Sequence, residues 1–156
     1  MLLVAHATSS MAKELEGFGE ARLRMTTEAV KRALPALAPD GGIPPADVAY
    51  FQLTKQRFLD LEPCTLRFNF FRDKLYEIQF DCGRDAKVVR TLEREFGDPT
   101  MRESYGTFWY WDGAVLGLSQ GSKVFGLSDR GMSPAVQQAI GRAAAAEKAA
   151  GTSPAK

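Results

Sequence analysis

The fold is decided by residues 64–82, which read CTLRFNFFRDKLYEIQFDC. Apolar and polar residues alternate on both sides of a polar turn, which is typical of two antiparallel strands that bury one face. A three-residue turn at 72–74, centred on Asp73, places apolar residues opposite apolar residues. The predicted pairs are Phe70 with Tyr76, Phe68 with Ile78, Leu66 with Phe80, and Cys64 with Cys82. A shift of one residue would oppose apolar and polar side chains along the whole ladder.

This register places the two cysteines of the chain directly opposite each other at the end of the hairpin. Opposed residues on antiparallel strands lie ~4.5–5.5 Å apart at Cα, which a disulfide can span. We therefore predict a disulfide between Cys64 and Cys82, which requires an oxidising compartment. The alternative is two buried thiols in a cytosolic core, where cysteine behaves as a small hydrophobe.

Helical patterns lie on either side of the hairpin. Thr26 can cap a helix that Pro35 ends or kinks, and Asp85 can cap a second helix that ends at Gly97. Residues 17–25 are predicted as an edge strand. The other predicted strands are 49–53, 64–70 and 75–82 after the first helix, and 107–111, 114–119 and 123–128 after the second. The order helix–strand–strand–strand thus occurs twice.

The predicted fold class is α+β. Tandem helix–three-strand units form one antiparallel sheet of about six strands, with the helices on one face and the other face partly open. Ser133-Pro134 begins an alanine-rich C-terminal helix with few large apolar side chains. It is expected to be a solvated terminal helix, with docking to a partner as the alternative.

The 156 residues suit a single domain, predicted over 13–131, followed by a C-terminal helix and disordered tail over 132–156. Residues 1–12 hold a short apolar run and then Ser10-Met11-Ala12, which fits a signal-peptide cleavage site. We therefore expect a signal-peptide remnant and a periplasmic or secreted protein. A disordered N-terminus on a cytoplasmic protein is the alternative.

The arrangement resembles the β-lactamase-inhibitor-protein-like fold, built from tandem helix–three-strand units. It also resembles small exported domains of the SmpA/OmlA-like group. Residues 23–30 look like the opening of such domains, although Arg24 stands where glycine is usual, and residues 74–78 and 95–99 look similar to exported domains of unassigned function. No lipobox cysteine lies near residue 13, so lipid anchoring does not carry over. The resemblance implies an exported α+β domain, and it transfers no catalytic residue.

Composition argues against several classes of function. The net charge of +1 argues against a polybasic nucleic-acid or membrane binder, and no apolar run approaches the ~20 residues of a membrane-spanning helix. One histidine and two cysteines nearly exclude a histidine triad or a four-cysteine zinc site, and no acidic spacing forms a calcium loop. We expect no cofactor, no metal and no enzymatic activity, although a small carboxylate-only hydrolase stays an alternative.

The aromatic strand at 107–111 carries the prediction of function. Trp109 and Trp111 are expected in the core, so that Phe108 and Tyr110 project from the opposite face of the sheet. The predicted binding residues are Phe108, Tyr110 and Val115 as apolar anchors, with Arg67 and Glu77 setting orientation. Exposed aromatic side chains are common anchors of protein interfaces. We predict a non-enzymatic binding domain of the assembly or inhibitor type with a protein partner of unknown identity. The other alternative is a cytosolic structural or regulatory homodimer subunit.

Overall fold

The structure, a computed structural model, describes residues 13–45, 47–61, 63–83 and 86–151. The helices are α1 (Thr27–Ala33), α2 (Ala86–Phe96) and α3 (Ser133–Gly151). The strands are β1 (Gly17–Phe18), β2 (Ala21–Arg22), β3 (Ala38–Pro39), β4 (Val48–Gln56), β5 (Cys64–Phe71), β6 (Lys74–Asp81), β7 (Met101–Glu103), β8 (Gly106–Tyr110), β9 (Ala114–Ser119) and β10 (Val124–Asp129). The chain is therefore α+β, with the predicted C-terminal helix present.

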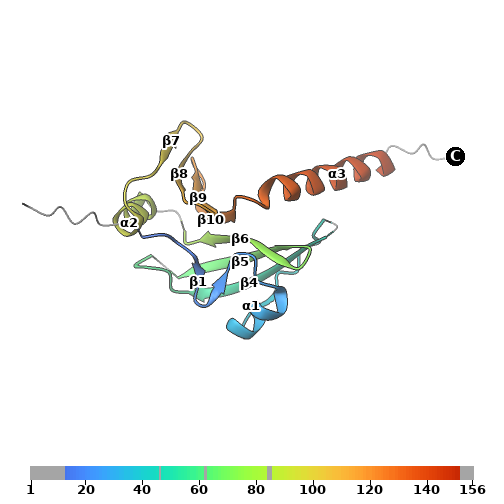
Figure 1. Ribbon diagram of the computed structural model, residues 1–156, viewed down its shortest axis with the longest axis horizontal. Helices are drawn as coiled ribbons and strands as arrows, with labels where there is room; N and C mark the ends of the chain where they lie inside the picture. Colours follow the sequence, from blue (N-terminus) through green and yellow to red (C-terminus); the bar gives the residue numbers. More distant parts are fainter. Residues whose placement is uncertain (1–12, 46, 62, 84–85, 152–156) are drawn as a thin grey trace, which may run out of the picture.

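One antiparallel sheet of eight strands organises the molecule, in the order β3-β4-β5-β6-β10-β9-β8-β7 (Figure 1). Each of α1 and α2 is followed by a short strand and then three longer ones. The predicted order of a helix followed by strands therefore does occur twice along the chain. The last strands of the two units, β6 and β10, pair at the centre. The predicted sheet of about six strands is too small because β3 and β7, of two and three residues, add one strand at each edge.

The central hairpin keeps the predicted register except next to its turn. Phe68 pairs with Ile78 and Leu66 with Phe80, as the alternation requires. The turn has two residues, Arg72 and Asp73, both at positive φ, so Phe70 pairs with Leu75 and not with Tyr76. A β-bulge absorbs the difference of one residue, since two residues on one strand then oppose one on the other. As a result Leu75 takes the place in the core that was expected for Tyr76.

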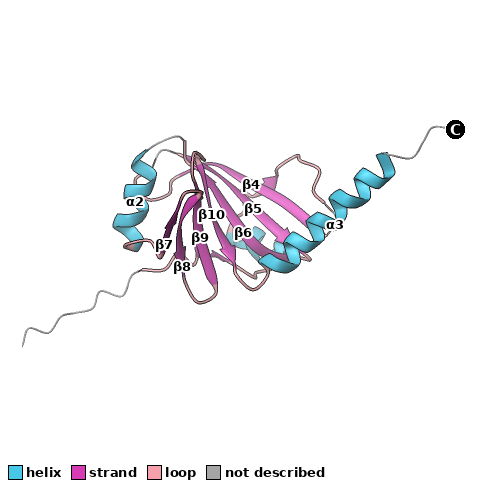
Figure 2. Ribbon diagram, turned by 90° about the horizontal axis from the view of Figure 1, so that it is seen from above, coloured by secondary structure: helices cyan, strands magenta, loops and turns pink. Residues whose placement is uncertain are grey.

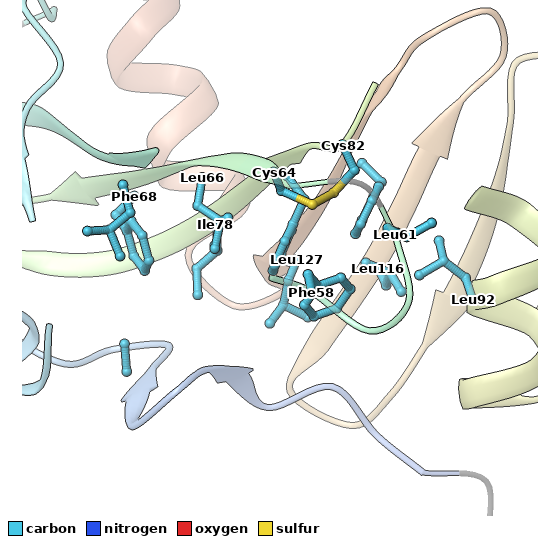
Figure 3. Close-up of a cluster of buried hydrophobic side chains, with 14 of the residues drawn as sticks. Phe58, Leu61, Cys64, Leu66, Phe68, Ile78, Cys82, Leu92, Leu116 and Leu127 are labelled. Carbon is cyan, nitrogen blue, oxygen red and sulfur yellow. A yellow bond between two sulfur atoms is a disulfide. The ribbon is translucent and has the colours of Figure 1, made fainter. Parts of the chain in front are cut away.

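The predicted disulfide is present and joins Cys64 to Cys82, with a Cα–Cα distance of 4.2 Å. Figure 3 shows it bridging the two strands among buried side chains of the main core. Helices α1 and α2 cover the same face, where they contribute Val30 and Leu92. Trp109 is also buried there and donates a hydrogen bond from its indole nitrogen to the carbonyl of Gly97 at 2.9 Å.

The N-terminal segments differ from expectation in one respect. The predicted edge strand at 17–25 is a separate two-stranded hairpin, β1–β2, which packs on the core through Phe18 and Ala21. The first helix is capped as predicted: the hydroxyl of Thr26 accepts from the backbone N–H of Ala29, and the helix ends before Pro35. The predicted cap at Asp85, the signal-peptide remnant at 1–12 and the final tail at 152–156 lie outside the described residues.

Helix α3 lies on the face of the sheet opposite α1 and α2 (Figures 1 and 2). Its first turns bury Val136 in a small second cluster with Val48, Phe71 and Tyr76. Beyond Ile140 its residues are mostly exposed, and Figure 2 shows the helix running outward past the edge of the sheet. Only one end of this second face is therefore covered. We call the second face the open face.

Candidate functional site

The five predicted binding residues all lie on the open face. Tyr110 pairs with Val115 across β8 and β9, and Phe108 is two residues away on the same side. Glu77 on β6 pairs with Asn69 on β5, and Arg67 lies two residues before Asn69 on the same side of β5. A hollow of about 320 Å³ brings three of the five together, since Glu77, Phe108 and Val115 line it.

Two glycines form the floor of this hollow, which we call the glycine-floored hollow. Gly117 on β9 pairs with Gly126 on β10, so no side chain rises from the sheet at these two positions. The ring of Phe108 occupies the space above Gly117, because a Cβ there would lie 3.0 Å from the ring. A Cβ at Gly106 would meet the same ring at 2.9 Å. The glycines thus let Phe108 lie close against the sheet and leave open space beside it.

The ring of Phe108 is the middle member of an aromatic row. Its centroid lies 5.6 Å from that of Tyr105 and 6.2 Å from that of Tyr110. Tyr105 is 60% exposed and Tyr110 is 36% exposed. The guanidinium of Arg130 lies 5.4 Å from the centroid of the Tyr110 ring. Helix α3 packs near the other end of the open face, so it does not cover this row.

The carboxylate of Glu77 lies between the glycine-floored hollow and the region below α3. It accepts hydrogen bonds from the amide of Asn69 at 2.7 Å, the amide of Gln79 at 3.0 Å and the hydroxyl of Ser128 at 3.4 Å. Gly126 makes room for it, since a Cβ there would lie 3.2 Å from Glu77 Oε1. All three donors are neutral, and no ion pair joins Glu77 to a lysine or arginine within the part of the chain that the structure describes.

A second hollow, of about 290 Å³, lies between the sheet and the first turns of α3, and we call it the α3 pocket. Asn69 lines it and is only 3% exposed, yet its Oδ1 atom has no hydrogen-bond partner. Tyr76 forms another part of the lining. Burial, with the nearby Glu77 and Tyr50, raises the pKa of the Tyr76 phenol, so this group stays protonated and neutral. Glu77 borders both hollows.

Arg67, the other charged residue predicted to set orientation, lines the α3 pocket and also makes contacts within the fold. Its guanidinium pairs with Asp40 at 2.6 Å and lies over the ring of Tyr50, 5.4 Å from the centroid. The Asp40 side chain is 4% exposed. Arg67 is thus engaged within the fold, and Glu77 is the charged residue of the predicted pair that carries no counter-ion among the described residues.

Sequence reasoning missed Asn69, Gly117 and Gly126 as members of the site. The alternation did assign Asn69 to the polar side of the hairpin, but nothing in the sequence indicated its burial by α3. The glycines carried a usable signal, because glycine inside a strand often marks a place where another group approaches the backbone closely. Tyr105, which precedes the predicted strand 107–111, is a further member of the aromatic row that the predicted binding residues did not include.

Other parts of the molecule offer less chemistry. A hollow of about 790 Å³ lies between α2 and the β7–β8 and β9–β10 turns, and Glu103 is the one charged side chain among the described residues that line it. The described residues contain no group of three histidine, cysteine or acidic side chains able to hold a metal ion. Among the described residues, Asp60, Asp73 and Asp129 have a lowered pKa, and each takes part in holding the fold together.

The physical causes of these three shifts are local. Hydrogen bonds from the side chain and backbone of Thr27 lower the pKa of Asp73. Desolvation raises the pKa of Asp60, but hydrogen bonds from Thr91 and Arg94 outweigh it and the net shift is downward. Desolvation also raises the pKa of Asp129, but Arg24 and hydrogen bonds from backbone N–H groups outweigh it, so the net shift is again downward.

Comparison of the chain with models of protein families, with curated proteins and with solved structures gives no match. Within the described residues, no helix has the length and apolar character needed to cross a membrane. The candidate site therefore rests on its own geometry: an aromatic row, a glycine-floored hollow and an acidic group beside it.

Proposed function

We propose that this protein is a non-enzymatic binding domain that takes a segment of a protein partner on its open face. The observation that carries the proposal is the aromatic row beside the glycine-floored hollow. Large aromatic side chains that stay accessible next to a hollow are typical anchors for a partner side chain. The polar groups around Glu77 would give the contact its orientation.

Export is a further part of the proposal. The disulfide between Cys64 and Cys82 supports it, because disulfides persist in oxidising compartments and are rare in the cytosol. We therefore place the protein in the periplasm or outside the cell. The predicted signal-peptide remnant would agree with this location.

The resemblance to inhibitor-like and SmpA/OmlA-like domains suggests an inhibitor or assembly role. The repeated order along the chain, in which a helix is followed by a short strand and three longer ones, supports such a relationship at the level of topology. Fold alone does not give function, so the role must be argued from the open face.

The test is selection of binding peptides from a displayed library on the full chain. Selected peptides are expected to lose at least tenfold in affinity for Phe108→Ser/Tyr110→Ser. They should bind Ile43→Ser normally, because Ile43 is 98% exposed in the loop between β3 and β4, away from β8 and β9 in the strand order, and so is a matched apolar control. Amide shifts on binding should map to β8, β9 and β10. Failure to select any peptide, or equal binding by the double variant, would overturn the proposal.

The aromatic row also suits a second copy of this chain as its partner. Multi-angle light scattering distinguishes the two cases: a dimer that Phe108→Ser/Tyr110→Ser converts to a monomer would favour the homodimer. A monomer at concentrations well above those used for peptide binding would favour a separate partner.

A further inference from the structure

The acidic centre of the open face has hydrogen-bonding capacity that the fold leaves unused. Glu77 accepts from three neutral donors, two of them on Oε2, while Oε1 receives one long bond from Ser128. Asn69 presents a second acceptor, Oδ1, that is buried and has no partner. The orientation of the Asn69 amide is fixed because its nitrogen must face the carboxylate of Glu77. Both residues line the α3 pocket, where Glu77 Oε1 has one long hydrogen bond and Asn69 Oδ1 has none.

An unpaired acceptor in a buried setting is costly, and a ligand that brings N–H donors would relieve that cost. Only 3% of the surface of Asn69 is exposed. The three donors bring no positive charge to the Glu77 carboxylate, and a cation gains more from a carboxylate in a shielded hollow than in water. The chemistry of the site therefore fits a cationic group with several N–H donors.

The other charged groups near these hollows are already paired. Arg67 forms an ion pair with Asp40, and Lys123 forms one with Asp81 at 3.2 Å. Each pair is neutral, so the charge that is left over at this part of the open face is the one on Glu77. A positively charged ligand is thus favoured over an anionic or neutral one.

We propose that Glu77 and Asn69 are the receptor for an arginine or lysine side chain of the protein partner. An apolar side chain beside that basic residue would lie in the glycine-floored hollow against Phe108. This inference rests on the proposed function, since it names the chemistry of the segment that the open face takes. The test uses a probe that distinguishes failure of this inference from failure of the proposed function.

The probe is ethylguanidinium chloride, titrated into the full chain and followed by nuclear magnetic resonance. Ethylurea is the neutral control of the same shape, and sodium chloride controls for ionic strength. We expect saturable shifts of the Asn69 side-chain amide and of backbone amides around Glu77, with half-saturation in the millimolar range. Ethylurea should bind at least tenfold more weakly. Equal binding of both probes, or shifts that grow linearly and spread over the whole surface, would overturn the proposal.

Two variants sharpen the test. Glu77→Gln removes the charge at constant size and should weaken ethylguanidinium binding at least tenfold. Gly126→Ala keeps the charge but places a Cβ against Glu77 Oε1, so it should weaken binding even if Glu77→Gln fails to fold. Glu20→Gln is the matched control, because it makes the same change of charge at an exposed residue between β1 and β2, and it should bind normally. Unchanged binding by the first two variants would overturn the proposal.

The selected peptides separate this inference from the proposed function. Peptides that need Phe108 and Tyr110, carry no basic residue and bind Glu77→Gln normally would overturn the inference and leave the proposed function standing. If ethylguanidinium binds as expected but no peptide is selected, the proposed function fails and the cation receptor remains. A basic residue at one fixed position in peptides that lose affinity for Glu77→Gln would support both.

Discussion

The guanidinium of Arg24 holds the carboxylate of Asp129 through two hydrogen bonds, of 2.6 Å from Nε and 3.1 Å from Nη2. Asp129 ends the last strand of the sheet, and its side chain is 3% exposed. Arg24 precedes α1 and has a φ of +70°, a conformation that favours glycine. The pair therefore ties the beginning of the first unit to the end of the second, 105 residues later. The side-chain interaction is a reason for arginine to occupy a strained position.

Substitutions at Arg24 should separate the contribution of its pair with Asp129 from the cost of its positive φ. Arg24→Ala leaves the buried carboxylate of Asp129 without its cation and is expected to lower the free energy of unfolding, because a buried charged group that loses its partner is costly. Arg24→Gly loses the same pair but relieves the positive φ, so it should be about 1 kcal/mol more stable than Arg24→Ala. Urea unfolding of the three proteins measures both differences. Alanine equal to or better than glycine would contradict the argument from backbone strain.

The lowered pKa of Asp129 predicts a dependence of stability on pH. In the unfolded chain this carboxyl titrates near its ordinary value of 3.8, and in the folded protein it titrates at a lower pH. The unfolded state thus binds more protons in this window, so its contribution is present above about pH 4 and is lost as pH falls through the folded pKa. Asp129→Asn should flatten the curve of unfolding free energy between about pH 2 and 5.

Asp60 and Asp73 also have lowered pKa values and should contribute in the same direction. Asp129→Asn is therefore expected to remove part of the acid dependence and not all of it. An identical slope in the variant and the original protein would show that Asp129 does not contribute.

The disulfide should contribute measurably to stability. Replacing both Cys64 and Cys82 with alanine removes a crosslink between residues 18 apart in sequence, which is worth about 3 kcal/mol by the chain-entropy relation. Thermal and urea unfolding of the variant measure the loss. Intact mass after alkylation under denaturing, non-reducing conditions should show no free thiol in protein from its native host. Two alkylated cysteines there would contradict both the disulfide and the argument for export.

The sequence predicted the centre of the sheet well because strict alternation leaves one register that buries apolar residues on a single face. It failed at the turn, where a two-residue loop with Arg72 and Asp73 at positive φ needs a bulge to keep the outer pairs in place. Arg72 is not a typical choice for a positive φ, and Asp73 stands at the second turn position, where glycine is usual, so the turn carried little local signal. The edge strands β3 and β7 were also missed, because two or three residues are too few to show an alternating pattern.

The open face was only partly predictable. The alternation placed Phe108 and Glu77 on it, because a strand fixes the side from which each residue projects. The position of α3 could not be predicted, because two large apolar side chains, Val136 and Ile140, do not indicate which face of the sheet the helix will cover. The burial of Asn69 follows from that docking and therefore could not be foreseen.

Strand β8 provides the last prediction, because its neighbouring residues face opposite sides of the sheet. Trp109 is 1% exposed, and Trp109→Ala should lower the free energy of unfolding by about 3–5 kcal/mol through the cavity and the lost indole hydrogen bond. Tyr110→Ser should stay within about 0.5 kcal/mol, as surface substitutions usually do. Phe108→Ser should lie between them, at about 1 kcal/mol, because its ring packs on Gly106 and Gly117 while part of it stays accessible. Chemical denaturation of the three variants checks the order. If Tyr110→Ser lowered the free energy of unfolding nearly as much as Trp109→Ala, the Tyr110 ring would belong to the core. The aromatic row would then not be a binding surface.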